Sequence, residues 1–454
     1  MLTRFRWMPA ACLATALALS SCGGDSSEQD PAPSPETDGA AGASGGPDGG
    51  KDATISDSQG PDAADVTWPD SADAMLDAKW DAKDGSKDGP APLDAGPCNP
   101  DPQTGSDGPR TVLVTHPFAT ESNQCGRRVR LLRLDVDGQL TDTGASLDVG
   151  DCPERVRFAP DGRLALVINN NSHDPQAGTQ SVVALRNDAA GKVVMAAELK
   201  QLAGANPVDI AFSPDGKKAY VADYNIEGQG GVHVLDVTPG CTASYVKKIP
   251  VTTPKATQVL PGDSFAVVLG GKSPIDTVVI DLAKGSVVKE YDLFSDFVDS
   301  QTLSLSPDGK VLIVPNSSPF SSLADTVSTV AIDSSGAAPV PSLQATLSGV
   351  TEPTGVAFSP DGLRVVVSNF SGDKVSWLKL AAQGTLSVEG SIASVPLAGF
   401  LTMLQRGPNA GLVLVTSVTS VRMLRLTDTG MEDKGALSIG AGAEAITGDI
   451  AIEP

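Results

Sequence analysis

Short apolar runs separated by turn residues fill the chain from Gly108 to its C-terminus. Some of these runs alternate apolar and polar residues, as in GVHVLDV, which is typical of half-buried β-strands. Others, such as LALVIN, are apolar almost throughout and indicate fully buried strands. No amphipathic helical pattern of useful length occurs among them. The pattern therefore predicts that residues 108–454 form an all-β domain.

A Pro-Asp-Gly turn between two apolar runs recurs along this domain. Four copies are plain and three less regular ones complete the series, with turn prolines at Pro109, Pro160, Pro214, Pro261, Pro307, Pro360 and Pro408. Successive prolines are 51, 54, 47, 46, 53 and 48 residues apart. Pro presets φ for the turn, and Gly tolerates a positive φ. Seven units of about fifty residues, each long enough for four strands, predict a seven-bladed β-propeller with four-stranded blades.

The two ends of the domain complement each other. The chain ends in DIAIEP, Asp449–Pro454, which matches DIAFSP at Asp209–Pro214, where a first strand is predicted. The first unit, by contrast, begins at its second strand, TVLVTH. We therefore expect the C-terminal segment to supply the innermost strand of blade one, which would close the ring and remove an exposed strand edge.

The N-terminus reads MLTRFRWMPAACLATALALSSCGG, with two early arginines before a short apolar core. This core is shorter than the ~20 apolar residues that span a bilayer, so residues 1–21 are predicted to be an export signal. The sequence LSSC, ending at Cys22, resembles the lipobox of bacterial lipoproteins. The resemblance implies cleavage before Cys22 and attachment of fatty acyl chains such as palmitate, which anchor the chain in a membrane. Gly23, in place of an Asp, favours the outer membrane. The alternative is an ordinary signal peptide with a chance cysteine.

Residues 22–107 are dominated by Gly, Ala, Ser, Pro and Asp. The stretch from Gly23 to Pro97 has 15 Asp and 2 Glu against 4 Lys, a net charge of −13. Such a segment buries too little apolar surface to offset about 1–2 kcal/mol of backbone entropy per residue, so we predict a disordered tether. Trp68 and Trp80 are either a short docking motif or aromatic residues tolerated in a linker.

Acidic residues outnumber basic ones, 55 to 33, for a formal net charge of −22, and aromatic residues make up 4% of the chain. Nucleic-acid phosphates repel an acidic protein, and few aromatic side chains leave little for base stacking. We therefore expect no nucleic-acid partner. The expected partners are the membrane, through the lipid anchor, and an envelope protein or small molecule. We expect the chain to be a monomer.

Polar or small residues recur nine positions after six of the turn prolines, where the second strands should end. The residues are Asn169, Asp223, Gly270, Asn316, Asn369 and Ser417, with His116 at the equivalent place in blade one. We expect them on the face opposite the Pro-Asp-Gly turns, near the mouth of the channel. One interpretation is a ring that holds a small ligand or a metal ion. The other is that these side chains bond to local backbone.

Motifs of established catalytic or cofactor sites are missing from the sequence. The histidines, His116, His173 and His233, lie in different repeats, and no His/Cys cluster has zinc spacing. The sequence contains no Gly-x-Ser-x-Gly elbow, no phosphate loop and no haem-attachment motif. We therefore expect no metal and no cofactor, and the sequence alone assigns no catalytic residue.

Apart from Cys22 and one cysteine inside the predicted signal, the chain has Cys98, Cys125, Cys152 and Cys241. An even number of cysteines in an exported chain favours disulfides, and four cysteines allow three pairings. In a propeller, the connections that hold Cys125 and Cys152 emerge on one face, whereas Cys241 and Cys98 approach the opposite face. We therefore predict the pairs Cys125–Cys152 and Cys98–Cys241. Four free thiols are the alternative.

The phrase FSPDGKKAYVAD resembles the YVTN repeat, in which a Pro-Asp-Gly turn leads into a Tyr-Val-small-Asn/Asp strand. Such repeats occur in lactonase-fold propellers and YncE-like proteins, and the resemblance covers the chain from about Gly108 to its end. It implies a propeller fold. For the lactonase-like members it also implies His, Arg and acidic side chains around the axial cleft.

The same scaffold hosts hydrolases, scaffolds and binding proteins, so the resemblance does not decide the activity. Because no catalytic set is recognisable, our first prediction is a cell-envelope lipoprotein whose propeller is a non-catalytic binding or scaffold module. The alternative is a lactonase-type hydrolase that acts at the channel mouth. A propeller that holds a redox cofactor ranks last.

Overall fold

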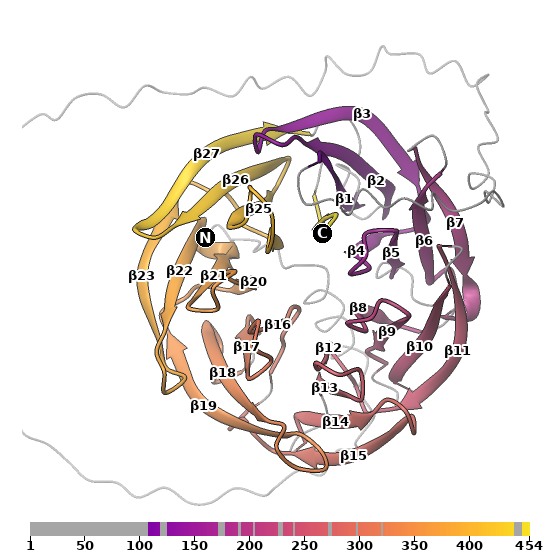
Figure 1. The fold of residues 1–454 in the computed structure, drawn as a ribbon, viewed down its shortest axis with the longest axis vertical. Helices are drawn as coiled ribbons and strands as arrows, with labels where there is room; N and C mark the ends of the chain where they lie inside the picture. The colour runs from indigo at the N-terminus through magenta and orange to yellow at the C-terminus, as the bar shows by residue number, and fades with distance from the viewer. Residues whose placement is uncertain are drawn as a thin grey trace, which may run out of the picture. The chain divides into compact units, whose positions relative to one another are not determined.

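The computed structural model describes residues 108–454, apart from 119–124, 171–177, 189–191, 203–204, 226–229, 239–240, 271–274, 297, 319–320 and 440–446. Its strands form seven four-stranded antiparallel sheets, which stand around an axis as the blades of a propeller (Figure 1). The predicted seven-bladed propeller is therefore confirmed. The predicted signal, Cys22, and the tether with Trp68 and Trp80 lie outside the described residues.

From the axis outward, blade one consists of β28 (Ile450–Ile452), β1 (Arg110–Phe118), β2 (Cys125–Leu134) and β3 (Leu140–Asp148). Blade two consists of β4 (Pro153–Phe158), β5 (Leu164–Asn169), β6 (Ser181–Asn187) and β7 (Val193–Leu199). Blade three consists of β8 (Pro207–Phe212), β9 (Lys218–Asp223), β10 (Gly231–Thr238) and β11 (Thr242–Pro250). Blade four consists of β12 (Ala256–Val259), β13 (Phe265–Leu269), β14 (Thr277–Asp281) and β15 (Ser286–Tyr291).

Blade five consists of β16 (Ser304–Leu305), β17 (Val311–Asn316), β18 (Thr326–Asp333) and β19 (Val340–Ser348). Blade six consists of β20 (Pro353–Phe358), β21 (Arg364–Asn369), β22 (Lys374–Leu380) and β23 (Leu386–Ala393). Blade seven consists of β24 (Leu401–Met403), β25 (Leu412–Ser417), β26 (Ser420–Thr427) and β27 (Gly430–Ser438). The described helices are two 3₁₀ turns, η2 (Lys200–Leu202) and η3 (Phe370–Gly372). Within the described ranges, no helix has the length and apolar character needed to cross a bilayer.

The Pro-Asp-Gly turn joins the first and second strands of a blade, as blade three illustrates. Ser213 donates its backbone N–H to the carbonyl of Lys218 at 2.9 Å, and its hydroxyl donates to the Asp215 carboxylate at 2.7 Å. Gly216 follows with a φ of 70°, a conformation that favours glycine. The motif therefore fixes both the reversal of the chain and the register of the first two strands.

Apolar side chains pack between neighbouring blades rather than at the centre of the ring. Seven buried clusters occupy the seven interfaces. Between blades two and three, for example, Leu166 and Val182 pack with Ile210 and Val221. Burial of such side chains stabilises the fold by about 1.5–3 kcal/mol each. The apolar core of the domain therefore lies in these interfaces.

The ring closes at blade one through the C-terminal strand. Strand β28 pairs with β1 in antiparallel register, with Ile452 opposite Val112. Thr115 donates its backbone N–H to the Asp449 carbonyl at 3.0 Å. The carboxylate of Glu453 accepts the backbone N–H of Thr111 at 2.9 Å. The predicted closure is therefore confirmed, and β1 has no exposed inner edge.

The outermost strands carry a repeated irregularity. Blades two to seven each have one extra residue opposite the middle of the third strand; the extra residues are Ala196, Val246, Val288, Gln344, Glu389 and Lys434. Such a β-bulge bends the strand and interrupts its ladder. It therefore protects the free outer edge of the blade from pairing with another chain.

Candidate functional site

The structure places the residues of the predicted mouth ring at the ends of second strands, with one exception. Asn169, Asp223, Asn316, Asn369 and Ser417 are the last residues of β5, β9, β17, β21 and β25, and Gly270 directly follows β13. His116 instead lies inside β1, opposite Arg128. Apart from Gly270, which has no side chain, all of these residues have buried side chains.

Most of these side chains bond to the backbone of the connection that leads into their own blade. Asp223 accepts the N–H of Asn206 at 2.8 Å, and Asn369 accepts that of Thr351 at 3.1 Å. The corresponding partners are Val149 for Asn169, Asp299 for Asn316 and Pro396 for Ser417. This geometry favours the second interpretation of the ring, in which the polar side chains hold the connections between blades.

Blade four shows why glycine takes this place there. A Cβ atom on Gly270 would lie 2.6 Å from the backbone nitrogen of Lys255 and from the carbonyl oxygen of Thr253. The φ of Gly270 is 100°, in the region that favours glycine. The close approach brings the backbone around Lys255 against the end of the second strand.

A second set of equivalent positions lies on the first strands, nearer the axis. In each blade, one residue before the turn donates its N–H to the carbonyl that begins the second strand, as Ala159 does to Leu164. Counting four residues back from each such donor gives the set Asp449, Arg155, Asp209, Ala256, Thr302, Gly355 and Phe400 for blades one to seven. We call this set the axial ring. Its composition is asymmetric, as a binding or catalytic site requires.

Arg155, in blade two, connects four blades across the axis. Its Nε donates to the Val208 carbonyl of blade three, and its Nη2 donates to the Gln301 carbonyl at the start of blade five, both at 3.0 Å. Its guanidinium lies 3.9 Å from the centroid of the Phe400 ring, next to β24 of blade seven. Burial lowers the pKa of Arg155 below its ordinary value. The guanidinium is therefore held in one position by three contacts.

Two carboxylates of the axial ring each bind the backbone of the next blade. Asp449 accepts the N–H of Val156 at 3.1 Å and forms an ion pair with Arg157. Asp209 accepts the N–H of Thr257 at 2.8 Å. Burial acts to lower the pKa of Arg157, but the Asp449 and Asp209 carboxylates together more than offset it, so that this pKa is raised. Asp449 is therefore committed to a structural ion pair.

Asp209 has no comparable cation bonded to it. Burial raises its pKa to about 6, against the opposing effects of Arg157, of the Thr257 N–H and of Arg155. A carboxyl group with a pKa near neutrality is suited to accept and return a proton at physiological pH. Strongly perturbed pKa values of this kind gather at functional sites.

Two hydrogen-bond donors, one on Gln301 and one on Arg155, have no hydrogen-bond partner among the described residues. The Nε2 of Gln301 is buried and makes no hydrogen bond, while the Oε1 of the same amide lies 3.5 Å from the Arg155 Nη2. The Nη1 of Arg155 also has no hydrogen-bond partner in the described part of the chain. A buried polar atom without a partner, such as Gln301 Nε2, is rare, and a water or ligand commonly accounts for it. Each of these donors could bind an oxygen atom of a ligand.

A charged cluster lies at the same end of the axis, in blades three to five. The Lys255 ammonium is 2.9 Å from the Asp299 carboxylate and 3.7 Å from the centroid of the Tyr224 ring. Lys255 directly precedes β12, and Asp299 lies two residues before Gln301. No sequence motif predicted Arg155, Asp209, Gln301 or this ion pair as site residues.

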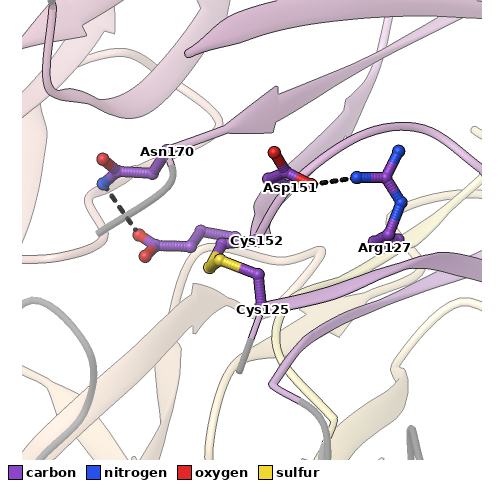
Figure 2. Close-up of a disulfide and its surroundings, with 6 residues drawn as sticks. Cys125, Arg127, Asp151, Cys152 and Asn170 are labelled. Atoms are coloured by element: carbon purple, nitrogen blue, oxygen red, sulfur yellow. Dashed lines mark hydrogen bonds and ion pairs between the residues drawn. A yellow bond between two sulfur atoms is a disulfide. The ribbon is translucent and has the colours of Figure 1, made fainter. Parts of the chain in front are cut away.

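The predicted disulfide between Cys125 and Cys152 is present, with a Cα–Cα distance of 4.7 Å (Figure 2). It links the start of β2 to the connection that leads into β4, the strand that carries Arg155. Arg127 forms ion pairs with Asp148 and Asp151 beside it. Cys98 lies outside the described residues, so the pairing Cys98–Cys241 stays a prediction; Cys241 itself is buried. Among the described residues, no three His, Cys, Asp or Glu side chains are grouped so as to hold a metal ion.

The comparisons with known proteins place the fold. No protein-family model matches the sequence, and no curated protein matches it. Among solved structures, a periplasmic gluconolactonase of Pseudomonas aeruginosa is similar, with a TM-score of 0.58 and 18% identity over 76% of this chain and 99% of that one. A putative 6-phosphogluconolactonase of Bacteroides fragilis has a TM-score of 0.60 and 17% identity over 78% and 99%.

A hypothetical selenium-binding protein of Sulfolobus tokodaii is also similar, with a TM-score of 0.58 and 10% identity over 78% of this chain and 96% of that one. Identities this low show a shared fold alone. The described domain is a seven-bladed β-propeller of the lactonase fold. Its axis carries an asymmetric set of buried charged residues.

Proposed function

We propose that this propeller is a lactonase-type hydrolase that opens a lactone at the axial ring. The proposal depends on two donors without a hydrogen-bond partner in the described part of the chain, Arg155 Nη1 and the buried Gln301 Nε2. The charge of Arg155 also acts on Asp209, a carboxyl group of raised pKa. Such donors suit an oxygen that becomes negatively charged during reaction. A carboxylate with a pKa of about 6 suits the role of general base.

The proposed reaction needs only water as a co-reactant. The lactone carbonyl oxygen accepts hydrogen bonds from Arg155 and Gln301, and ionised Asp209 takes a proton from a water molecule. The water oxygen adds to the carbonyl carbon, and the bond between that carbon and the ring oxygen breaks. The ring oxygen takes the proton back from Asp209 and becomes a hydroxyl. The product is the open hydroxy acid, and Asp209 is ionised again.

The fold is compatible with this activity but does not specify it. Two similar structures are described as lactonases, whereas a third, equally similar in fold, is described as a selenium-binding protein. Because one scaffold hosts several activities, the argument depends on the axial residues. The second candidate function is the non-catalytic binding or scaffold module. It is favoured by the burial of Arg155, Asp209 and Gln301, of which only 5–6% is exposed.

We also propose that the chain is an exported lipoprotein, anchored through Cys22 to the outer membrane. The predicted signal and lipobox support this location. The disulfide between Cys125 and Cys152 adds independent support, because such bonds persist in oxidising compartments outside the cytoplasm. The tether predicted from the sequence would hold the propeller away from the lipid surface.

The test is the rate of proton release when the purified full chain is mixed with D-glucono-1,5-lactone, measured above the uncatalysed rate. We expect Arg155→Met and Asp209→Asn to lower kcat/KM by about 10²-fold or more. A matched control is Asp215→Asn, which changes an aspartate of the same repeat in the exposed turn. If the wild-type chain does not exceed the uncatalysed rate, the hydrolase proposal is wrong and the binding module remains.

A further inference from the structure

Two hydrogen bonds alone do not fix the direction in which Arg155 Nη1 points. The Nε and Nη2 of Arg155 donate to the carbonyls of Val208 and Gln301, in blades three and five, both at 3.0 Å. Because the guanidinium is a rigid plane, these bonds hold two of its nitrogens on the line between the two carbonyls. The group could still tilt about that line. A third contact, outside the line, is needed to fix Nη1.

Phe400 supplies a contact of this kind from blade seven. The guanidinium carbon of Arg155 lies over the Phe400 ring, 3.9 Å from its centroid. The negative face of an aromatic ring attracts a cation, and the attraction is stronger where water is excluded. Arg155 is 5% exposed, so little water competes with the ring. Phe400 therefore attracts the guanidinium and limits its tilt.

The backbone around Phe400 is itself firmly held. The Phe400 carbonyl accepts the N–H of Thr416 in β25 at 2.9 Å and the hydroxyl of the same residue at 3.2 Å. Gly399 donates its N–H to the Thr416 carbonyl at 2.8 Å, and its own carbonyl accepts the hydroxyl of Ser368 in blade six. A Cβ atom on Gly399 would lie 2.8 Å from the Thr416 hydroxyl oxygen, so this close approach requires glycine. Blades six and seven thus fix the place of the ring.

No other axial-ring residue could take over this contact. All seven residues of the set are among those that the structure describes, and Phe400 is the aromatic one. The equivalent residues of blades four and six are Ala256 and Gly355, which have a methyl group and no side chain. The asymmetry of the axial ring therefore includes a single ring placed against its buried arginine.

We propose that Phe400 is a positioning residue of the lactone site: its ring fixes the tilt of the Arg155 guanidinium and thereby directs Nη1 at the reacting carbonyl oxygen. This inference rests on the proposed hydrolase function. A donor to a developing oxyanion is effective when it is directed in advance at the place where the charge develops. Loss of the ring should therefore lower kcat more than it raises KM.

The experiment is a double-mutant cycle on the full chain, with kcat and KM for D-glucono-1,5-lactone as the measurements. Phe400→Leu should lower kcat by about tenfold or more, because small misplacements of a catalytic group are costly. In the Arg155→Met background the same substitution should change kcat by less than about twofold, because the group that Phe400 positions is gone. Phe400→Tyr, which keeps the ring, should stay within about threefold of the wild-type kcat.

The matched control is Phe265→Leu, at the start of β13 in blade four. Phe265 is partly exposed, as Phe400 is, but it packs against the apolar cluster between blades four and five. This substitution should leave kcat unchanged. Circular dichroism checks that each variant folds, and Phe400→Met carries the same comparison if Phe400→Leu does not fold.

The outcomes separate the two proposals. If the wild-type chain does not exceed the uncatalysed rate, the hydrolase function is wrong and the role of Phe400 falls with it. If the wild-type chain is active, three results overturn the role of Phe400 alone. These are an unchanged kcat in the folded variant without the ring, a loss confined to KM, and an equal loss of kcat in the Arg155→Met background.

Discussion

The side-chain carboxylate of Asp449, at the C-terminal end of the chain, accepts the backbone N–H of Val156 in the first strand of blade two at 3.1 Å. Asp209, in blade three, makes the same contact to the backbone N–H of Thr257 in blade four. This type of hydrogen bond, from a backbone N–H to a carboxylate of the preceding blade, therefore joins the innermost strands of successive blades. In blade one it joins segments 293 residues apart in sequence, so it also holds the closed ring together.

Ring closure predicts a strong effect of a single buried side chain in β28. Ile450 is 1% exposed and packs in the cluster between blades seven and one. We expect Ile450→Ala to lower the free energy of unfolding by about 2–5 kcal/mol, because a cavity remains at the seam. Leu363→Ala is the control, since Leu363 is 61% exposed and its loss should change stability by at most about 0.5 kcal/mol. Denaturant unfolding measures both, and equal effects would contradict closure by this strand.

The disulfide predicts a second loss of stability in the same part of the ring. It closes a segment of 27 residues between Cys125 and Cys152. Replacing both with serine should lower the free energy of unfolding by about 3 kcal/mol, on the chain-entropy account of cross-links. Arg127→Gln, which removes only the exposed ion pairs beside it, should cost less than about 1 kcal/mol.

Peptide mapping under non-reducing conditions tests the pairing itself. It should recover Cys125 linked to Cys152, and a second linked pair of Cys98 with Cys241. A Cys98 peptide found as a free thiol would contradict the second pairing without touching the first.

The fold could be predicted from the sequence because its information is repeated. Pro214 and its six counterparts occupy the same place in seven repeats. The regular repeats therefore identify the irregular ones. The match between DIAIEP and DIAFSP revealed the closure in the same way. The β-bulges escaped prediction, because the extra residues, such as Val246 and Lys434, share no side-chain chemistry.

The candidate site escaped prediction for the opposite reason. The polar residues at the strand ends were noticed because they recur, and recurrence marks a structural role here. The residues of the axial ring differ from blade to blade, as Arg155, Asp209 and Phe400 do. Five positions before the turn proline, the other repeats have small or apolar residues, whereas two repeats have the charged residues Arg155 and Asp209. This contrast between repeats was the feature of the sequence that could have predicted the site. The bonds from Arg155 to blades three and five depend on the closed ring, which no local pattern contains.

The proposed lipid anchor at Cys22, which lies outside the described residues, predicts a simple labelling result. Cys22→Ala should abolish metabolic labelling with palmitate and release the exported chain into the soluble fraction, because the acyl chains supply the membrane affinity. Cys12→Ala, within the predicted signal, should leave labelling unchanged. Membrane-bound Cys22→Ala protein in detergent-free extracts would mean that another attachment exists.

The raised pKa of Asp209 predicts how stability depends on pH. The folded state holds this proton up to about pH 6, whereas an unfolded aspartate releases it near its ordinary pKa of 3.8. The contribution of this group to stability is therefore full below about pH 4 and is lost as pH rises through 6. The difference of about two pKa units corresponds to about 3 kcal/mol.

The measurement is the difference in unfolding free energy between the wild-type chain and Asp209→Asn, taken from pH 4 to pH 7. Asparagine can still accept the Thr257 N–H, so the substitution removes mainly the titration. Relative to this variant, the wild-type chain should lose about 3 kcal/mol across the range. Asp215→Asn is the control: hydrogen bonds from the Lys217 N–H and from Ser213 lower the pKa of Asp215 to about 2, so its contribution changes only below about pH 4. If the Asp209→Asn difference stays flat between pH 4 and pH 7, Asp209 is ionised throughout, and its proposed role as a base that titrates near pH 6 is lost with it.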